Sequence, residues 1–407
     1  MRDMQATALA PEETAVAAKV TPESAPAWLA VASLAISTFA SVTTEFMPVG
    51  LLTPIAASLG VSEGTAGLLV TVPGIVAAVT GPLLIVASGR LDRRTLLLVL
   101  SALLVASNLL AALAPNLSTM LVARMLLGLV VGGFWTFAPG ATAHMVPPRL
   151  QAQAMSYVLA GISIATVVGI PAGALLGNLA GWRAAFGTTA VLAAAVLLLQ
   201  LRILPAMPAA QASVPRDLLV PFTARAPRAV LIAALFLVTG HFMAYTYLGP
   251  LLRQVYGMSA DGITSLLLLY GIAGFAGTFL GGQLARRSVT GLACAAALLI
   301  GGAELFSALV GGGTLAAGVV VFAWGVAFGF VPVAMTTWMQ QALPAAPETG
   351  QAILVTAFQV SIAFGAFAGG RVVDAYGVTG ALLASGVLAA LAALIISRTR
   401  APAMPEL

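Results

Sequence analysis

Apolar segments long enough to cross a lipid bilayer recur along almost the whole chain, and they constrain the fold more than any other feature of the sequence. Of the 407 residues, 60% are hydrophobic and only 8% are charged, whereas a soluble domain carries about 25% charged residues. A backbone in lipid must satisfy its own hydrogen bonds, so helices and closed barrels are the possible spanning structures. Because the apolar runs are continuous and do not alternate with polar residues, we predict an all-α polytopic membrane protein.

Twelve transmembrane helices are predicted, separated by short breaks rich in Arg, Pro, Gly or Asn. Their expected first residues are 28, 66, 95, 118, 153, 184, 228, 262, 289, 314, 350 and 378. Trp28 thus begins the first span. The residues before it contain Pro, Glu, Thr and Ala, without a basic start that leads directly into an apolar core. We therefore expect residues 1–26 to be a disordered cytoplasmic tail and not a cleaved signal peptide.

The arginines are distributed unequally between the two sides of the membrane. With the N-terminus inside, the cytoplasmic side receives Arg90, Arg93, Arg94, Arg149, Arg202, Arg216, Arg225, Arg228, Arg286, Arg287, Arg398 and Arg400, and the opposite side receives Arg183, Arg253 and Arg371. This asymmetry satisfies the positive-inside rule, so we expect a multi-pass membrane protein with both termini in the cytoplasm. Because the basic residues are scattered over many loops, the pI of 9.9 needs no nucleic-acid partner.

An internal repeat divides the chain into two halves of the same membrane orientation. It consists of three matches, at offsets of 197, 193 and 196 residues: Gly128 and Gly132 with Gly325 and Gly329, SGRLDRR at 88–94 with GGQLARR at 281–287, and VGIPAGALLGNLAGW with FGAFAGGRVVDAYGV. Each match is weak alone, but three in the same order are hard to obtain by chance. We expect two pseudo-symmetric six-helix bundles, residues 27–204 and 227–399, a cytoplasmic linker over 205–226 and a cytoplasmic tail over 400–407.

Segments in both halves resemble the major facilitator superfamily, in particular its twelve-helix drug and metabolite efflux branch. They are TTEFMPVGLLTPIAASLGVS at 43–62, ARMLLGLVVGGFW at 123–135, GIPAGALLGNLAGWRAAF at 169–186 and GHFMAYTYLGPLL at 240–252. The chain is most similar there to arabinose, sugar, chloramphenicol and purine-ribonucleoside exporters. The resemblance implies the major facilitator fold and alternating access to a small-molecule site between the halves. We expect a monomer whose partners are this substrate, protons and the lipid bilayer.

The resemblance also implies two sets of gating residues. The loop after the second span holds a reduced form of the family's cytoplasmic gate motif, without its second Gly, in Gly89, Asp92, Arg93 and Arg94. A shortened form of the Gly/Pro motif associated with exporters contains Gly169, Pro171 and Gly173.

Glu45 and Arg124 are the expected proton-coupling residues. Each charged group inside an apolar span costs roughly 2.5 to 3.5 kcal/mol on insertion scales, so each requires an explanation. The two residues lie roughly 25 Å from the inner edge of the membrane, at 1.5 Å per residue. A polar stripe of Ser37, Ser41, Thr44 and Pro48 is expected on the side of the helix that carries Glu45. Alternatives remain: Glu45 capped by neighbouring hydroxyl groups, and Arg124 extending toward the lipid headgroups.

The expected substrate-binding residues are Glu45, His241, Tyr245, Tyr247, Gln359 and Thr356. Aromatic rings and a neutral imidazole suit stacking and hydrogen bonding to a sugar, nucleoside or flat drug. The alternative for His241 is a satisfied histidine between helices. Glu304 is interpreted as structural, because the resemblance makes the ninth helix a peripheral scaffold, and His144 as a loop or interface residue. Gly128 and Gly132 are interpreted as packing residues.

The leading functional hypothesis is a secondary transporter of a bacterial inner membrane that exports a small organic solute (a sugar, nucleoside or drug) in exchange for protons. A uniporter or importer on the same scaffold is the alternative. Cys294 is the only cysteine, which excludes a disulfide framework and a thiolate metal site. The sequence contains no HExxH, GxSxG or Gly-rich GK[ST] motif, so we expect neither an enzyme nor ATP-driven transport, and no metal or cofactor. A channel would not require the duplicated halves.

Overall fold

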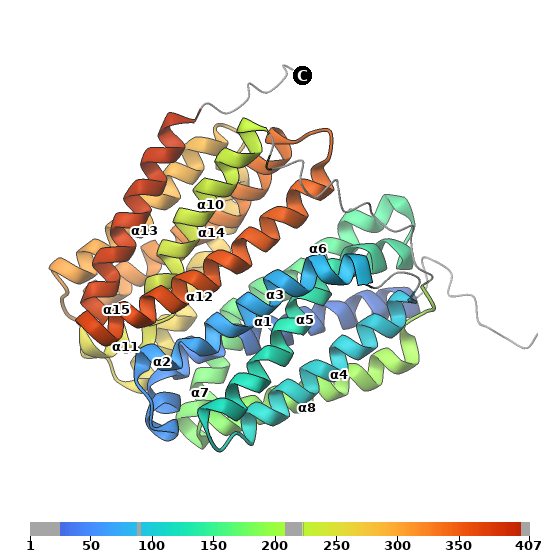
Figure 1. The fold of residues 1–407 in the computed structure, drawn as a ribbon, viewed down its shortest axis with the longest axis horizontal. Coiled ribbons are helices and arrows are strands. Elements are labelled where there is room, and N and C mark those ends of the chain that lie inside the picture. The colour runs from blue at the N-terminus through green and yellow to red at the C-terminus, as the bar shows by residue number, and fades with distance from the viewer. Residues whose placement is uncertain (1–24, 88–90, 208–221, 223, 400–407) are drawn as a thin grey trace, which may run out of the picture.

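The computed structural model describes residues 25–87, 91–207, 222 and 224–399, and this part of the chain contains helices and no strand (Figure 1). The helices of the N-terminal half are α1 (Ala25–Leu59), α2 (Glu63–Ala66), α3 (Leu68–Ala87), α4 (Arg93–Ala112), α5 (Leu117–Met145), α6 (Gln151–Ile164), α7 (Ile170–Ala180) and α8 (Trp182–Ile203). A 3-10 turn, η1 (Pro148–Leu150), precedes α6, and a π-helical turn, η2 (Ala165–Gly169), joins α6 to α7. The C-terminal half consists of α10 (Arg225–Tyr245), α11 (Leu248–Gln254), α12 (Ala260–Leu284), α13 (Val289–Leu309), α14 (Thr314–Ala342) and α15 (Pro347–Arg398).

The predicted all-α membrane fold is confirmed. Within the described residues, 11 helices are long and apolar enough to cross a membrane, and the last of them, Thr349–Arg398, has 50 residues. That helix, α15, contains a non-helical break at Gly377, where φ is 72°. This left-handed conformation is available to glycine at little cost, so α15 changes direction there and supplies two spans. The eleventh and twelfth predicted spans are therefore joined by a bend and not by a loop.

The two halves lie side by side, each held together mainly by contacts among its own helices (Figure 1). In the N-terminal half α3 and α4 pack on α5, and in the C-terminal half α10 and α13 pack on α15. Most of the predicted linker, residues 205–226, lies outside the described residues, as do residues 1–24 and 400–407 of the predicted tails.

Contacts between the halves gather at one end, which we call the closed end: the end that contains α2, α7 and α11. There α3 and α2 contact α15, and α7 and η2 contact α12. One buried apolar cluster of the C-terminal half continues into the N-terminal half through Val49, Val70, Ile170 and Ala174. We call the opposite end, where α4, α6, α10 and α13 begin, the open end, because the ribbons of the two halves diverge toward it (Figure 1).

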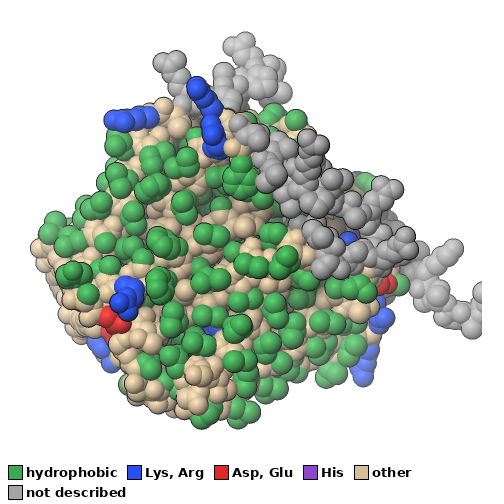
Figure 2. Space-filling model, viewed as in Figure 1, with side chains coloured by type: hydrophobic (Ala, Val, Ile, Leu, Met, Phe, Trp, Pro, Cys, Tyr) green, Lys and Arg blue, Asp and Glu red, His purple; other side chains and the backbone are tan. Residues whose placement is uncertain are grey.

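The surface is apolar around the middle of the molecule and basic at its ends (Figure 2). Large hydrophobic side chains are widely exposed, for example Leu315 at 83% and Phe279 at 66% of their surface. Such exposure suits contact with lipid chains. By helix direction, the open end carries Arg93, Arg94, Arg149, Arg202, Arg225, Arg228, Arg286, Arg287 and Arg398, and the closed end carries Arg183, Arg253 and Arg371. Arg90, Arg216 and Arg400 lie outside the described residues.

Candidate functional site: a buried carboxyl group between the halves

Glu45 lies midway along α1, where the two halves meet, and only 5% of its surface is exposed. Its carboxylate accepts a hydrogen bond from Nε2 of Gln359, on α15 of the other half, at 3.4 Å. The next residue, Phe46, stacks on Phe242 of α10 with ring centroids 5.6 Å apart. The carboxyl group of the first helix is therefore in direct contact with both halves, and Gln359, one of the expected cavity residues, supplies the contact from the second.

Arg124 is completely buried, and its guanidinium group donates to three backbone carbonyls. Nε donates to Leu69 at 2.7 Å, Nη1 to Thr44 at 2.8 Å and Nη2 to Glu45 at 2.9 Å. None of these bonds goes to a carboxylate, but the guanidinium lies near enough to act on the Glu45 carboxyl group electrostatically. The structure thus places Arg124 inside the bundle and not toward the headgroups.

Two prolines explain why Arg124 finds free carbonyls inside a bundle of helices. In a helix the N–H of a residue bonds the carbonyl four residues earlier, and proline has no N–H. Pro48 of α1 therefore leaves the carbonyl of Thr44 unbonded, and Pro73 of α3 leaves that of Leu69 unbonded. Arg124 supplies the missing donor to both. One side chain on α5 thereby joins α1 and α3 beside Glu45.

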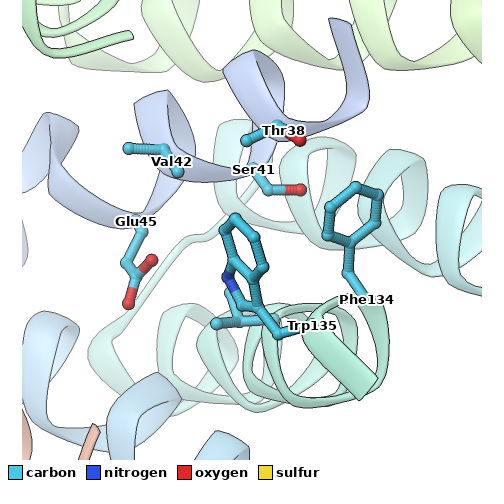
Figure 3. A pocket seen from close by; sticks show the side chains of 7 residues that line it. Thr38, Ser41, Val42, Glu45, Phe134 and Trp135 are labelled. Carbon is cyan, nitrogen blue, oxygen red and sulfur yellow. The ribbon is translucent and has the colours of Figure 1, made fainter. Parts of the chain in front are cut away.

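A small cavity adjoins Glu45 within the N-terminal half (Figure 3). Thr38, Ser41, Val42 and Glu45 line it from α1, and Val131, Phe134 and Trp135 line it from α5. Its volume of about 10 Å³ is close to that needed for one water molecule. The hydroxyl of Ser41 is buried and has no hydrogen-bond partner within the described part of the chain. The cavity is thus lined by both the Glu45 side chain and a buried hydroxyl group without a partner.

The expected polar stripe on α1 is only partly present. Ser41 shares the cavity with Glu45, but the Ser37 hydroxyl accepts from Gln200 of α8 at 2.9 Å. Thr44 donates to Asn108 of α4 at 3.2 Å. The prediction was wrong for Ser37 and Thr44, because Thr44 is about 100° around the helix from Glu45 and because α8 offers Ser37 a partner inside the half.

His241 lies in an aromatic cluster of the C-terminal half, which we define as His241, Phe242, Tyr245, Tyr270, Trp324 and Phe328. The imidazole stacks on Phe328 at 3.9 Å between centroids and on Tyr245 at 5.0 Å. It is fully buried. His241 and Tyr245 are thus brought together as expected, although in this conformation the rings of the cluster pack against one another.

The hydrogen bonds of His241 define its tautomer. Indole Nε1–H of Trp324 is a donor only, and it lies 3.0 Å from Nδ1 of His241, which must therefore be the acceptor. The ring proton is then on Nε2, which is 3.5 Å from the Tyr270 hydroxyl. His241 is a neutral imidazole in this arrangement, because a proton on Nδ1 would break the bond from Trp324.

One of the expected substrate residues lies elsewhere. Tyr247 is at the closed end, where its hydroxyl donates to the Ala366 carbonyl at 2.8 Å and its ring packs in an apolar cluster with Leu52 and Val373. Tyr247 does not line a common surface with His241, because α10 ends at Tyr245 and the chain turns there. Thr356 is half-buried one turn before Gln359, and its hydroxyl donates to the Ala352 carbonyl of its own helix at 3.2 Å.

The expected gate residues of the loop after the second span contact their own half. Asp92 caps α4, accepting from the Arg94 N–H at 2.7 Å and from the Met207 N–H at 3.0 Å. Arg93 lies over the Phe137 ring at 4.9 Å. Gly89 is outside the described residues. The bond from Met207 holds the start of α4 against the segment that follows α8.

The Gly/Pro segment packs on α1 beside the candidate site. A Cβ added at Gly169 would overlap the Thr43 hydroxyl, and one added at Gly173 would lie 2.8 Å from Met47. Pro171 follows the π-helical turn η2, and such turns are frequent at functional sites. Gly128 and Gly132 likewise lie against the Pro73 and Ala77 carbonyls of α3, as expected for packing residues.

The contacts that hold the closed end together were not predicted. Asp374 of α15 accepts from the Ser62 hydroxyl at 2.9 Å and from the Gly64 N–H at 3.1 Å. Glu63 of α2 accepts from Thr53 at 2.6 Å and from Gln254 at 3.0 Å. These polar residues lie close to the predicted ends of spans, where polar residues are common, so nothing in the sequence separates them from other residues at span ends.

The sequence does contain one signal that could have linked Glu45 and His241. The segment Glu45-Phe46-Met47 in α1 corresponds to His241-Phe242-Met243 in α10, 196 residues later. This is the same offset as that of the Gly/Pro segment. The residues at which the two halves come together thus occupy equivalent positions in the repeat.

Comparison with known proteins identifies the family. The model described as Major Facilitator Superfamily matches residues 34–352. The chain is 35% identical over 372 residues to the purine ribonucleoside efflux pump NepI of Shigella sonnei and to that of Escherichia coli K12. Each match covers 91% of this chain and 94% of the relative. The protein of the same name from Salmonella enteritidis is 34% identical over the same share of each chain.

Solved structures of transporters share the fold at low sequence identity. The nucleoside transporter NupG matches 91% of this chain and 99% of its own with a TM-score of 0.75 and 15% identity. A bacterial homologue of the lysosomal transporter Spinster, in an inward-facing and occupied conformation, matches 90% of this chain and 95% of its own with a TM-score of 0.73 and 15% identity.

Proposed function

Because the chain belongs to the major facilitator superfamily, we propose that it is a proton-coupled exporter of purine ribonucleosides in which Glu45 binds the exchanged proton. The observation that carries the proposal is the position of the Glu45 carboxyl group. It is buried at the meeting of the two halves, contacts Gln359 of the second half at 3.4 Å and lies in the electrostatic range of Arg124. A carboxyl group there is exposed to a different side of the membrane each time the halves rock.

Substrate exchange follows from competition for Glu45. In the ionised form the carboxylate attracts hydrogen-bond donors such as those of Gln359 or of a substrate, and in the protonated form it attracts them less. Arg124 favours the ionised form through its positive charge. Binding of a proton then releases the substrate, and loss of the proton prepares the site for the next substrate molecule. Each turnover exchanges one ligand for the other.

A purine ribonucleoside fits the chemistry of the cavity. Phe46, Phe242 and Phe328 offer aromatic faces to a flat base, and Gln359 and Glu45 offer polar groups to the base edge or ribose hydroxyls. The relatives at 34–35% identity are named purine ribonucleoside efflux pumps, which supports the same substrate class and direction here. The aromatic cluster is closed in this conformation, so Phe328 or Phe242 must turn aside to admit a base.

The closed end is the outer end of the transporter in this proposal. The described arginines gather at the open end, which the positive-inside rule assigns to the cytoplasm. The relatives come from bacteria, so the membrane is the inner membrane of a bacterial cell, and both termini are in the cytoplasm. A green fluorescent protein fused to the C-terminus should fluoresce in cells, whereas alkaline phosphatase fused there should be inactive. Active phosphatase would contradict the orientation.

The experiment that tests the proposal uses purified protein in liposomes with an imposed pH gradient and a radiolabelled purine ribonucleoside. The wild-type protein should concentrate the nucleoside on the acidic side and consume the gradient. Glu45→Gln, which keeps the size and hydrogen bonds of the side chain, should fold normally but lose this concentration. A Glu45→Gln variant that still concentrates the nucleoside would contradict the role of Glu45.

Control measurements separate substrate class from coupling. A pyrimidine ribonucleoside, a pentose and chloramphenicol, tested in the same liposomes, should be concentrated at least about tenfold less well, as expected when a site built for particular polar groups rejects other ligands. Asp261→Asn is a matched variant, because Asp261 is an exposed carboxyl group at the closed end, away from the candidate site, and it should retain concentration. Equilibration without concentration by the wild type would favour a uniporter.

A further inference from the structure

We propose that Glu304 is a second proton-binding residue, in the C-terminal half, and that Tyr270 and His241 connect it to the substrate cavity. This inference rests on the proposed proton coupling. The sequence alone favoured a structural role for Glu304, on a helix expected to be peripheral. The structure gives it surroundings that a structural role does not explain.

Glu304 is fully buried in α13, which packs on α14 and α15. Neither of its carboxyl oxygens has a hydrogen-bond partner among the described residues. An ionised carboxylate without donors inside a membrane bundle is strongly unfavourable. In this conformation the carboxyl group is therefore held in its neutral form, with a proton that it can lose only when the surroundings change.

The helices around Glu304 present few other ionisable groups. Across from it are Ser385 of α15, whose hydroxyl donates to the Gly240 carbonyl at 2.5 Å, and Tyr270 of α12, which is in its electrostatic range. Helix α14 has no ionisable side chain, and the buried ionisable groups of α10 are His241 and Tyr245, which both lie next to Tyr270. The described ionisable side chains of α15 lie next to its bend or at its end: Arg371, Asp374, Tyr376 and Arg398. No cation opposes Glu304 from these described segments.

The hydrogen bonds that link Trp324, His241 and Tyr270 all run in one direction, with the donor on the Trp324 side of each bond. Trp324 donates to Nδ1 of His241, so Nε2–H of His241 is the donor toward the Tyr270 oxygen, at 3.5 Å. The Tyr270 hydroxyl proton is then free to point to another acceptor. Glu304 does not bond Tyr270 in this conformation, because both of its carboxyl oxygens are without a partner among the described residues, so the connection requires the two groups to move within hydrogen-bond distance. There an ionised Glu304 would accept the Tyr270 proton, whereas a protonated Glu304 would compete as a donor. The protonation of Glu304 therefore changes which way the Tyr270 hydroxyl turns and how firmly His241 is held.

The internal repeat gives independent support. Glu45 and His241 occupy equivalent positions, 196 residues apart, and so do Asn108 and Glu304. In the N-terminal half Asn108 is linked to the first helix through Thr44, which precedes Glu45. In the C-terminal half the neighbouring Ser385 is linked to Gly240, which precedes His241. Each half thus has one acidic residue at these two positions. In the N-terminal half it is Glu45, on the first helix, and in the C-terminal half it is Glu304, on the third helix.

The test is the number of protons exchanged per nucleoside. It is obtained in liposomes, with the membrane potential clamped at zero, from the ratio of nucleoside concentrations on the two sides at which net flux stops. Each exchanged proton multiplies this ratio by about ten for each pH unit of gradient. The wild type should reach about 100-fold per unit, and Glu304→Gln about tenfold. Tyr270→Phe, which keeps the ring and removes the hydroxyl, should show the same fall, and it serves if Glu304→Gln does not fold.

A matched control is Ser307→Ala. It removes a buried hydroxyl group that lies one turn from Glu304 and that bonds the Tyr256 hydroxyl at 2.8 Å. It should keep the wild-type ratio. The second proton site would be overturned if the wild-type protein reached a ratio of only about tenfold per pH unit. It would also be overturned if Glu304→Gln and Tyr270→Phe both reached the wild-type ratio. Either outcome would leave the role of Glu45 intact. A wild-type ratio independent of the gradient would overturn proton coupling itself.

Discussion

The carboxylate of Asp374 accepts a hydrogen bond from the Ser62 hydroxyl at 2.9 Å and thereby joins α15 of the C-terminal half to the turn before α2 in the N-terminal half. The Gly64 N–H donates to the same carboxylate at 3.1 Å. These bonds are present only while the closed end is closed, because Ser62 and Asp374 belong to different halves. They should therefore set the balance between the two conformations.

Asp374→Ala should shift this balance toward the conformation with the closed end open. Loss of the two bonds should cost about 1–2 kcal/mol, a factor of roughly 5 to 30 in the ratio of conformations. Spin labels at Ala57 and Ala375, introduced together with Cys294→Ala, should report a larger share of long distances. Asp261→Ala, also at this end, is the control and should leave the distances unchanged. An unchanged distribution in Asp374→Ala would show that the bonds to Asp374 do not contribute to the closure.

Gly64→Ala should prevent the closed end from closing. The added Cβ would overlap the Gly370 carbonyl oxygen, which is backbone and cannot turn aside. The same spin labels should separate, and transport should fall about tenfold or more. Gly187→Ala is the matched control, because an added Cβ there meets nothing within 4 Å. Wild-type transport by Gly64→Ala would mean that closure of this contact is dispensable.

Arg124→Gln should destabilise the protein by about 1–3 kcal/mol for each carbonyl left without a donor. Pro48→Ala in the same chain should recover part of this loss, because an alanine N–H can bond the Thr44 carbonyl that Arg124 no longer reaches. Thermal unfolding in detergent of the two single variants and the double variant gives the coupling energy. Purely additive effects would show that the Thr44 carbonyl does not need Arg124.

Ser41→Val should fill the water-sized cavity beside Glu45. Proton-driven concentration of nucleoside should slow by about tenfold, as when a general acid or base loses its relay. Exchange of labelled for unlabelled nucleoside should continue, since it requires no proton step. Ser33→Ala is the control, because that hydroxyl is buried on the same helix but bonds the Ala30 carbonyl. If Ser41→Val slowed the exchange of labelled for unlabelled nucleoside as much as it slowed proton-driven concentration, the cause would be a packing defect.

The positions of the helices were predictable because they depend on local composition. The predicted first residues of the spans agree within three residues with the observed helices, from Ala25 for the first to the bend at Gly377 for the last. The ends are marked by residues that act locally, such as the capping Asp92, Asn116 and Ser288. The bilayer requires length and low polarity of each segment, and both can be read from a window of sequence.

The surroundings of the buried polar residues were not predictable in the same way. Glu45 and Arg124 were recognisable as charges in apolar spans, but the bonds from Arg124 depend on carbonyls that Pro48 and Pro73 free on two other helices. Tyr247 was expected beside His241 and lies at the closed end, because the chain turns after Tyr245. Trp324, Phe328 and Tyr270 looked like ordinary apolar residues until the helices brought them around His241.

The sequence by itself determined the membrane class, the number and limits of the spans, the twofold repeat and the few buried charges, since each follows from residue type and spacing. The tertiary structure decided which of those groups have a partner. Gln359 bonds Glu45 and Ser62 bonds Asp374, whereas Glu304 has no hydrogen-bond partner among the described residues. The physical reason is that hydrophobicity acts on each segment separately, whereas a hydrogen bond requires two particular atoms within about 3 Å. Residues hundreds of positions apart reach that distance only when the helices have packed.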